Sequence, residues 1–225
     1  TLVNGALTIA KANATVTGNS ANVTYNGSDQ SVSGFTATGL VNGQTESVLS
    51  GVTASGASGA NFGTYTNTVS GTDSNYNLTL VNGTLSIAKA ALTVTGANAT
   101  PSYTGLAQTN SAATITGIQG NTDSFTITGY GTGTNAGTYN DTLLATAAGA
   151  TNAANYTISY TNGSLVIGKA TLTVTADNKT KVYGDVNPAL TATITGYVNG
   201  ESASVITGTP AISTTATQYS NVASY

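Results

Sequence analysis

Apolar and polar residues alternate on both sides of one Asn-Gly pair. Every second position is apolar in 76–80, and again in 85–87, with Asn82-Gly83 between the two runs. A period of two is typical of a half-buried β-strand. Asn-Gly is a strong hairpin signal, because both residues tolerate the positive φ of a type I′ turn. The pattern therefore predicts strands over 76–81 and 84–87, joined as a hairpin that places Leu80 opposite Leu85 and Leu78 opposite Ile87.

The same pattern surrounds two other Asn-Gly pairs. Around Asn162-Gly163 a two-residue turn places Tyr160 opposite Leu165 and Ile158 opposite Ile167. Around Asn4-Gly5 it places Leu2 opposite Leu7. Three occurrences of one phrase indicate a repeated unit of architecture.

Positions counted from a recurring lysine define this repeat. One tyrosine recurs at a constant distance after each lysine, and another recurs near the end of a later loop. The recurring residues are Lys11, Lys89 and Lys169; Tyr25, Tyr103 and Tyr183; and Tyr65, Tyr139 and Tyr225. The period is much longer than the 20–50 residues or so of a solenoid coil, which favours a small self-contained β-domain. The predicted organisation is a closing hairpin of a preceding module (1–10), a first module (11–88), a second module (89–168), and a third module (169–225) that stops before its closing hairpin.

Each module is expected to be all-β. In the second, short strands are predicted over 91–97, 101–108, 111–117, 123–130, 137–146, 155–161 and 164–168. Seven short strands separated by turn signals favour an immunoglobulin-like β-sandwich. The segment 135–139, Asn-Ala-Gly-Thr-Tyr, resembles a tyrosine corner, in which the hydroxyl bonds to the upstream backbone. The alternative is a β-grasp-like module with one short helix, for which 145–150 is the best candidate.

Composition narrows the functional classes. Charged residues make up 6% of the chain, against roughly 25% in an average globular protein. The five cations are all lysine, and with a sequence pI near 4.4 no basic stripe is available to neutralise nucleic-acid phosphates. No run is long and apolar enough to predict a membrane span. The chain contains no His and no Cys, so the common nucleophile–base pairs are missing and we expect no enzyme.

The remaining polar residues suggest structural roles. None of the eight carboxylates forms a calcium loop of D-x-D-x-D-G type, so we expect solvated loop carboxylates, no metal site and no cofactor. In the predicted register Tyr76 lies opposite Lys89 and Tyr156 opposite Lys169. We expect each lysine stem to pack on the tyrosine face; the alternative is a lysine–asparagine isopeptide bond.

The third repeat resembles a known family. Residues 181–190, KVYGDVNPAL, and 195–201, TGYVNGE, are similar to the MBG ("mostly beta, glycine") repeat of YGX type, as is the closing phrase NYxLxLVNGxLxI. The first two repeats lie between MBG and the related YDG repeats. The resemblance covers the whole chain. It implies tandem modules of large bacterial surface or secreted proteins, including filamentous-haemagglutinin-like adhesins, and it carries no catalytic residues.

Three functions agree with this resemblance. The first is the structural stalk of a bacterial extracellular adhesin or surface filament, in which each module contacts its neighbours in the same chain. The second is direct binding of a glycan or a host matrix protein by the modules. The third is a self-assembling filament, in which residues 1–10 complete the third module of a like chain by strand donation.

Overall fold

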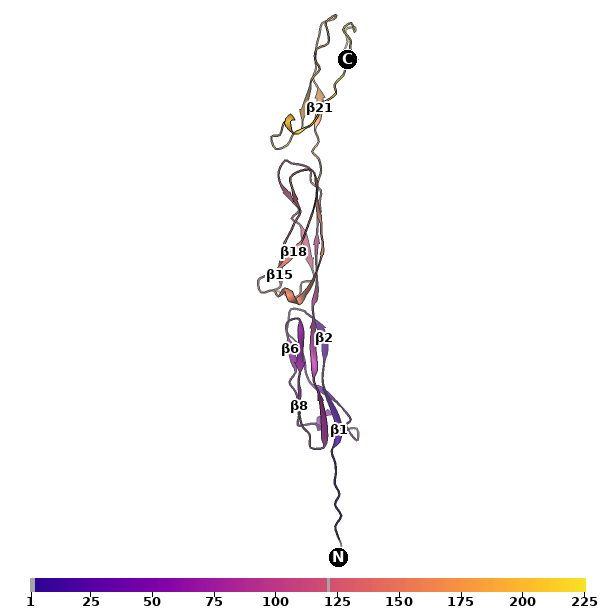
Figure 1. The fold of residues 1–225 in the computed structure, drawn as a ribbon, viewed down its shortest axis with the longest axis vertical. Coiled ribbons are helices and arrows are strands. Elements are labelled where there is room, and N and C mark those ends of the chain that lie inside the picture. Colours follow the sequence, from indigo (N-terminus) through magenta and orange to yellow (C-terminus); the bar gives the residue numbers. More distant parts are fainter. Residues whose placement is uncertain (1–2, 121) are drawn as a thin grey trace. The chain divides into compact units, whose positions relative to one another are not determined.

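The computed structural model describes residues 3–120 and 122–225. Within these residues the regular elements are β-strands and three single-turn 3-10 helices, which confirms the predicted all-β class (Figure 1). The helices are η1 (Glu46–Val48), η2 (Ala153–Asn155) and η3 (Ala203–Val205). The strands of the first repeat are β1 (Ala12–Gly18), β2 (Ala21–Thr24), β3 (Gln30–Val32), β4 (Phe35–Thr38), β5 (Val52–Ala54), β6 (Ala57–Gly59), β7 (Gly63–Asn67), β8 (Val69–Gly71), β9 (Tyr76–Val81) and β10 (Gly83–Ala88).

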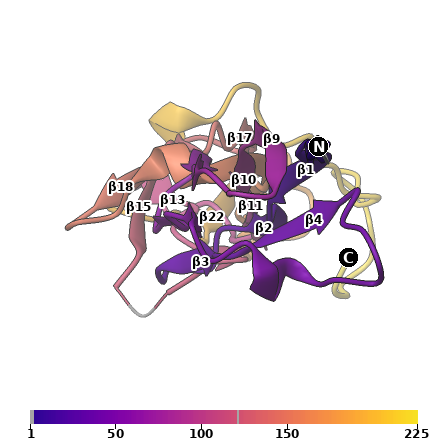
Figure 2. The same cartoon turned by 90° about the horizontal axis from the view of Figure 1, so that it is seen from below.

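The first and last strands of the first repeat run in parallel. We call residues 12–24 its opening segment and 76–88 its closing segment. β9 pairs with β1 and β10 pairs with β2, and the sequence separation between partners is the same in both pairs, as in Ala12 beside Tyr76 and Ala21 beside Leu85. One register therefore continues through two sheets. In the first sheet β1 lies between β4 and β9 (Figure 2), and in the second β10 lies between β2 and β7.

The hairpin predicted at Asn82-Gly83 is wrong. β9 and β10 belong to different sheets, and neither Asn82 nor Gly83 has a positive φ. The buried positions change from even to odd numbers across this pair: Leu85 is buried, whereas Leu80 is 38% exposed. This change of phase accompanies the passage of the chain from one sheet to the next.

The other two predicted hairpins are also missing. In the second repeat β19 (Tyr156–Thr161) pairs with β11 (Ala90–Gly96), while β20 (Ser164–Ile167) pairs with β12 (Asn98–Ala99) and β17 (Gly137–Asn140). Asn162-Gly163 is thus a second sheet switch. Residues 3–10 form no strand, and Leu2 lies outside the described residues.

The Asn-Gly pair is suited to this switch for a steric reason. The Asn82 side chain accepts a hydrogen bond from the Val69 N–H at 3.0 Å, which fixes the closing segment to the strand beside it. A Cβ atom on Gly83 would lie 2.2 Å from the carbonyl oxygen of Asn19, where the opening segment makes its own switch. The two backbones therefore approach too closely for any residue with a side chain.

The first repeat contains two hydrophobic cores, one on each side of the switch. Figure 1 shows β1 and β8 in one half of the repeat and β2 and β6 in the other. The first core lies in the half that contains β1, β4, β5, β8 and β9, and its buried members are Ala14, Val16, Leu49, Val52, Val69 and Tyr76. The second core, which we call the junction core, contains residues of both the first and second repeats: Tyr25, Ala57, Leu85, Ile87, Ala90, Leu92 and Tyr156. The hydrophobic core is thus continuous across the boundary between these repeats.

The remaining strands correct several sequence-based boundaries. They are β13 (Gln108–Thr109), β14 (Ala113–Thr116), β15 (Ser124–Thr128), β16 (Thr132–Gly133), β18 (Leu144–Ala148), β21 (Thr173–Ala176) and β22 (Ala192–Thr195). Of the strand predicted over 101–108, only a bridge at Ser102 and Gln108, the first residue of β13, are found. The strand predicted over 137–146 is broken into β17 and β18, which lie in different sheets. Residues 145–148, within the helix candidate of the β-grasp alternative, pair as a strand with β15.

The chain divides into two compact units in the middle of the second repeat. One unit contains the first repeat together with 114–128 and 144–161, and the other contains 96–113, 129–143 and the third repeat. Each boundary between two repeats therefore lies inside a compact unit. The immunoglobulin-like arrangement within a repeat stays a prediction.

The Gly83→Ala variant tests the close approach of the two segments. We expect it to lower the free energy of unfolding by about 1–3 kcal/mol, because the added methyl group overlaps the Asn19 carbonyl. Gly5→Ala is the matched control, since Gly5 has the same sequence context but a methyl group added there would meet no atom within 4 Å. Urea unfolding of the whole chain measures both. Equal effects of the two substitutions would contradict the sheet switch.

Candidate functional site

A cluster of aromatic side chains holds the first and second repeats together. Tyr25 and Tyr156 are both buried, with ring centroids 5.4 Å apart and an interplanar angle of 76°. Phe125 packs edge-on against Tyr156 at 5.3 Å. Both tyrosine hydroxyls donate to one oxygen of Asp123, Tyr25 at 2.8 Å and Tyr156 at 2.5 Å. Edge-to-face aromatic pairs and hydrogen bonds to a carboxylate are among the stronger side-chain interactions, so this cluster ties the end of one repeat to the next.

The cluster shifts the ionisation of its tyrosines. Burial, with the hydrogen bond to Asp123 as the second cause, raises the pKa of Tyr156 to about 12. Burial likewise raises the pKa of Tyr25, again followed by the hydrogen bond to Asp123. Both causes disfavour a second negative charge beside the carboxylate. The cluster therefore keeps its hydroxyl protons well above neutral pH.

The second and third repeats meet through a corresponding pair. Tyr103, the counterpart of Tyr25, donates its hydroxyl to the Glu201 carboxylate. Asn199 donates to the carbonyl of Gly105 at 3.1 Å. The hydrogen bond to Glu201 is the main cause that raises the pKa of Tyr103. In both junctions the first recurring tyrosine of a repeat thus donates to a carboxylate of the following repeat.

Sequence reasoning missed these two carboxylates. The expectation of solvated loop residues is wrong for Asp123 and Glu201, because each accepts a tyrosine hydroxyl, and for Asp141, which is buried. The sequence did contain a signal for these two carboxylates, because they lie at nearly the same distance after their repeat lysines, Lys89 and Lys169. The third tyrosine of this set, Tyr183, is 61% exposed.

The recurring lysines do not face the predicted tyrosines. Tyr76 pairs with Ala12 and Tyr156 with Ala90, because the strands are parallel. The ammonium of Lys89 lies 4.9 Å from the centre of the Phe62 ring, a cation–π contact with an unpredicted partner. The other two lysines are placed differently: Lys11 donates to the carbonyl of Asp73 at 2.7 Å, and Lys169 lines a pocket described below.

The predicted tyrosine corner is confirmed, and it occurs in all three repeats. Tyr139 donates its hydroxyl to the carbonyl of Asn135 at 3.0 Å. Tyr65 and Tyr225 make the same bond, also at 3.0 Å, to the residues four positions upstream, Asn61 and Asn221. These tyrosines therefore have a structural role within each repeat.

A buried polar group fixes the sheet switch of the first repeat. Asn67 is fully buried, and its amide donates to the carbonyls of Asn19 at 3.1 Å and Gly34 at 2.9 Å. Its oxygen accepts from the N–H of Gly56 at 2.9 Å. A buried amide with all these bonds made is stabilising, whereas an unpaired one would be costly.

In the second repeat, two residues together make the hydrogen bonds at the sheet switch that Asn67 makes in the first. Asp141 replaces the asparagine, and its carboxylate accepts from the N–H groups of Gly131 at 2.7 Å and Gly163 at 3.1 Å. A carboxylate cannot donate, so Asn110 supplies the amide: it donates to Asp141 at 3.0 Å and to the Ala97 carbonyl at 2.7 Å. The position of Asn110 is taken in the first repeat by Val32. The change from Asn67 to Asp141 and the change from Val32 to Asn110 therefore compensate one another.

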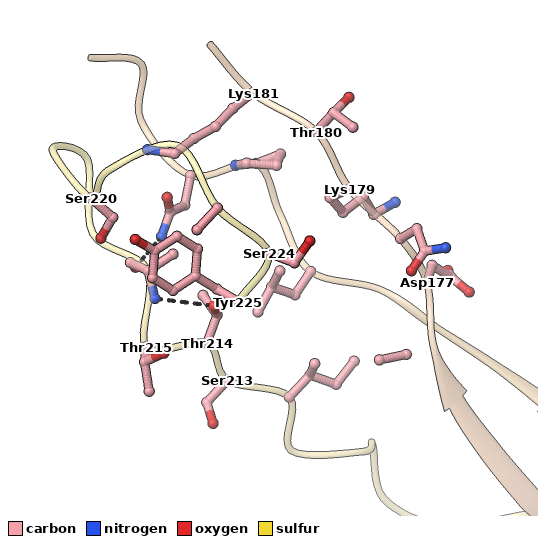
Figure 3. Close-up of a pocket in the computed structure, with 18 of the residues that line it drawn as sticks. Asp177, Lys179, Thr180, Lys181, Ser213, Thr214, Thr215, Ser220, Ser224 and Tyr225 are labelled. Carbon is pink, nitrogen blue, oxygen red and sulfur yellow. Dashed lines mark hydrogen bonds between the residues drawn. The ribbon is translucent and has the colours of Figure 1, made fainter. Parts of the chain in front are cut away.

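The third repeat has an open strand position. β21 pairs with β22 only, whereas its counterpart β1 lies between two strands; this holds for the described part of the chain. One pocket is lined by Leu172, Tyr197, Val205 and Ile206, and the Tyr197 hydroxyl is buried without a hydrogen-bond partner. A second pocket lies between 176–181 and 220–225 (Figure 3). The corresponding segments of the first repeat contain β2 and β7, which enclose β10, so the two pockets together mark the place of a closing segment.

The YGX loop borders this second pocket and is held by one lysine. Lys181 donates to three backbone carbonyls, those of Asp185 at 2.9 Å and of Thr217 and Gln218 at 3.0 Å each. These bonds use all three of its protons. The lysine therefore connects the YGD turn to the chain that precedes the third tyrosine corner.

No metal-ligand cluster of three or more acidic, His or Cys side chains is found in residues 3–120 and 122–225. The same residues include no helix that is long and apolar enough to cross a membrane.

Comparison with known families identifies the class of protein. The family of MBG domains (YGX type) matches residues 14–86 and 172–225, more than half of the chain. The chain therefore belongs to the MBG domain family, a family of structural repeat modules that occur in surface proteins. Neither the curated proteins nor the solved structures contain a match.

Alkaline unfolding tests the junction cluster. In the unfolded chain Tyr156 ionises near pH 10, whereas in the folded chain its pKa is about 12. Between these values the folded state binds more protons, so the free energy of unfolding should fall as the pH rises. Tyr156→Phe should reduce this slope, and Tyr219→Phe, at an exposed position, should not. Urea titrations from pH 9 to 12 measure how the free energy of unfolding changes with pH. An unchanged slope in Tyr156→Phe would contradict the role of Tyr156 in the junction cluster.

A peptide tests the open strand position. A peptide with the sequence of residues 155–168 should bind the third repeat parallel to 172–182 and slow hydrogen exchange there. A scrambled peptide of the same composition is the control. A spin label at the peptide N-terminus should broaden NMR signals near Leu172 more than those near Val182. Slower hydrogen exchange outside 172–182, or stronger broadening near Val182 than near Leu172, would contradict a parallel closing strand at this position.

Proposed function

We propose that this chain is part of the structural stalk of a bacterial extracellular adhesin or surface filament. The observation that carries the proposal is the junction core, which joins the first and second repeats without a linker. Only Lys89 separates β10 from β11. A short joint with a shared core limits the independent motion of adjacent domains. A stalk that holds a distant group away from a cell needs this property.

The polar chemistry of the chain also supports a structural role. The carboxylates Asp123, Asp141 and Glu201 are engaged by tyrosine, asparagine or backbone donors of the chain itself. With no His and no Cys in the sequence, the usual nucleophile–base pairs are not available. We infer that the chain has no catalytic activity.

The filament alternative requires strand addition by residues 1–10 of a like chain, and no contact among the described residues supports it. The glycan-binding alternative has less support, because the recurring aromatic residues Tyr25, Tyr103 and Tyr139 make bonds within the chain.

Labelling on the producing bacterium tests the stalk. Antibody against the repeats should bind intact cells, and immunogold electron microscopy should place it outside the envelope. Inserting one further repeat should move a tip-proximal label outward by roughly 40 Å, since the strand residues of an opening segment such as 12–24 rise about 3.3 Å each. Insertion of the same number of residues as a Gly/Ser linker is the control. Labelling only after cell lysis, or no regular outward shift, would refute the proposal.

A further inference from the structure

The opening and closing segments of a repeat determine how that repeat carries tension. The chain enters the first repeat at Ala12 and leaves it at Ala88. Ala12 pairs with Tyr76 at one end of the parallel register, and Ala88 pairs with Thr24 at the other. Backbone bonds mark both ends: the Ala12 N–H donates to Asn75 at 2.9 Å and the Tyr25 N–H donates to Ala88 at 2.8 Å.

This arrangement fixes the direction in which force acts on the hydrogen bonds. Tension along the chain pulls the start of the opening segment and the end of the closing segment in opposite directions, parallel to the strands. All ladder bonds are then loaded together in shear. In an antiparallel hairpin, force applied to its two adjacent ends would instead open the bonds one after another.

Side chains continue the ladder where the strands change sheet. In the first repeat the Ser20 hydroxyl accepts from the Thr84 N–H at 3.0 Å. In the second repeat Asn98, at the same repeat position, accepts from the Ser164 N–H at 3.0 Å. The first bond lies in the gap between β1 and β2, and the second joins Asn98 and Ser164 where β12 and β20 begin to pair, just after the switch. Two different residue types therefore make the same connection.

The second repeat has the same geometry. Its opening and closing strands pair in parallel with one constant sequence separation, from Ala90 beside Tyr156 to Ala99 beside Leu165. A bridge between Ser102 and Gly168 and the bond from the Tyr103 N–H to Gly168 at 2.7 Å end the register.

We propose that the paired opening and closing segments form a shear clamp, which makes the first and second repeats resist unfolding under tension applied along the chain. The use of this clamp in a stalk rests on the proposed function, but the mechanical property itself does not. Resistance to force depends on the unfolding barrier rather than on equilibrium stability. The clamp raises that barrier because many bonds must break before any length of chain is released.

Pulling the whole chain in two directions tests the clamp. The natural sequence has no Cys, so cysteine pairs can serve as unique handles in single-molecule force spectroscopy. Lys11→Cys with Lys89→Cys loads the clamp in shear; Ser28→Cys with Lys89→Cys applies force at one end of the same register and opens it stepwise. We expect a severalfold higher rupture force for the first pair. Equal forces, or a higher force for the second pair, would overturn the proposal.

Two further measurements distinguish the mechanical effect of the clamp from general stability, and the clamp proposal from the stalk proposal. Rupture in the shear geometry should lengthen the molecule by the extended length of the segment between the two handles, roughly 260–280 Å, less the separation of the handles in the folded repeat, which shows that the first repeat was folded. Ser20→Ala should lower the shear rupture force more than the matched Ser58→Ala, which lies in β6 outside both segments. An equal effect of the two variants would overturn the role of Ser20. None of these readouts depends on where the protein is located, so they fail or succeed independently of the labelling experiment.

Discussion

Parallel pairing between the two ends of a repeat is the constraint on which the rest of this structure depends. Because the closing segment follows the opening segment in direction and register, it leaves the repeat at the end opposite to the one where the chain enters. The next residues can then serve as the opening segment of the following repeat. Ala88 and Ala90 are separated only by Lys89, and the junction core forms around this continuous stretch. The tandem arrangement is thus a result of strand direction.

The same constraint explains where polar groups are buried. Two segments that change sheet side by side leave backbone groups unpaired at the crossing, and a buried unpaired group is costly. Asn67 meets this need in the first repeat, and Asp141 with Asn110 meets it in the second. Few charged residues are then needed inside the repeats. The carboxylates that are used accept hydrogen bonds from neutral donors.

Local features of the fold could be predicted from the sequence, and long-range pairing could not. The period, the all-β class and the tyrosine corner at Tyr139 follow from short patterns with a fixed local geometry. The hairpin prediction failed because Asn82-Gly83 has the composition of a tight turn, while its glycine is required by the backbone at Asn19, far away in the sequence. The apolar positions could not correct this prediction, because a two-residue hairpin and a sheet switch both shift them from even to odd numbers. Asp123 was missed because its partners, Tyr25 and Tyr156, come from two different repeats.

The long separation between paired segments has a consequence for the order of folding during synthesis. Ala12 has its parallel partner only after Tyr76 has been made, which at about 5–20 residues per second takes roughly 3–13 s. Until then the opening segment exposes an unpaired edge, and such edges promote aggregation. Contacts between residues this far apart in the sequence also slow folding. Each repeat that closes presents the next opening segment already extended, so folding can proceed in one direction from the first repeat onward.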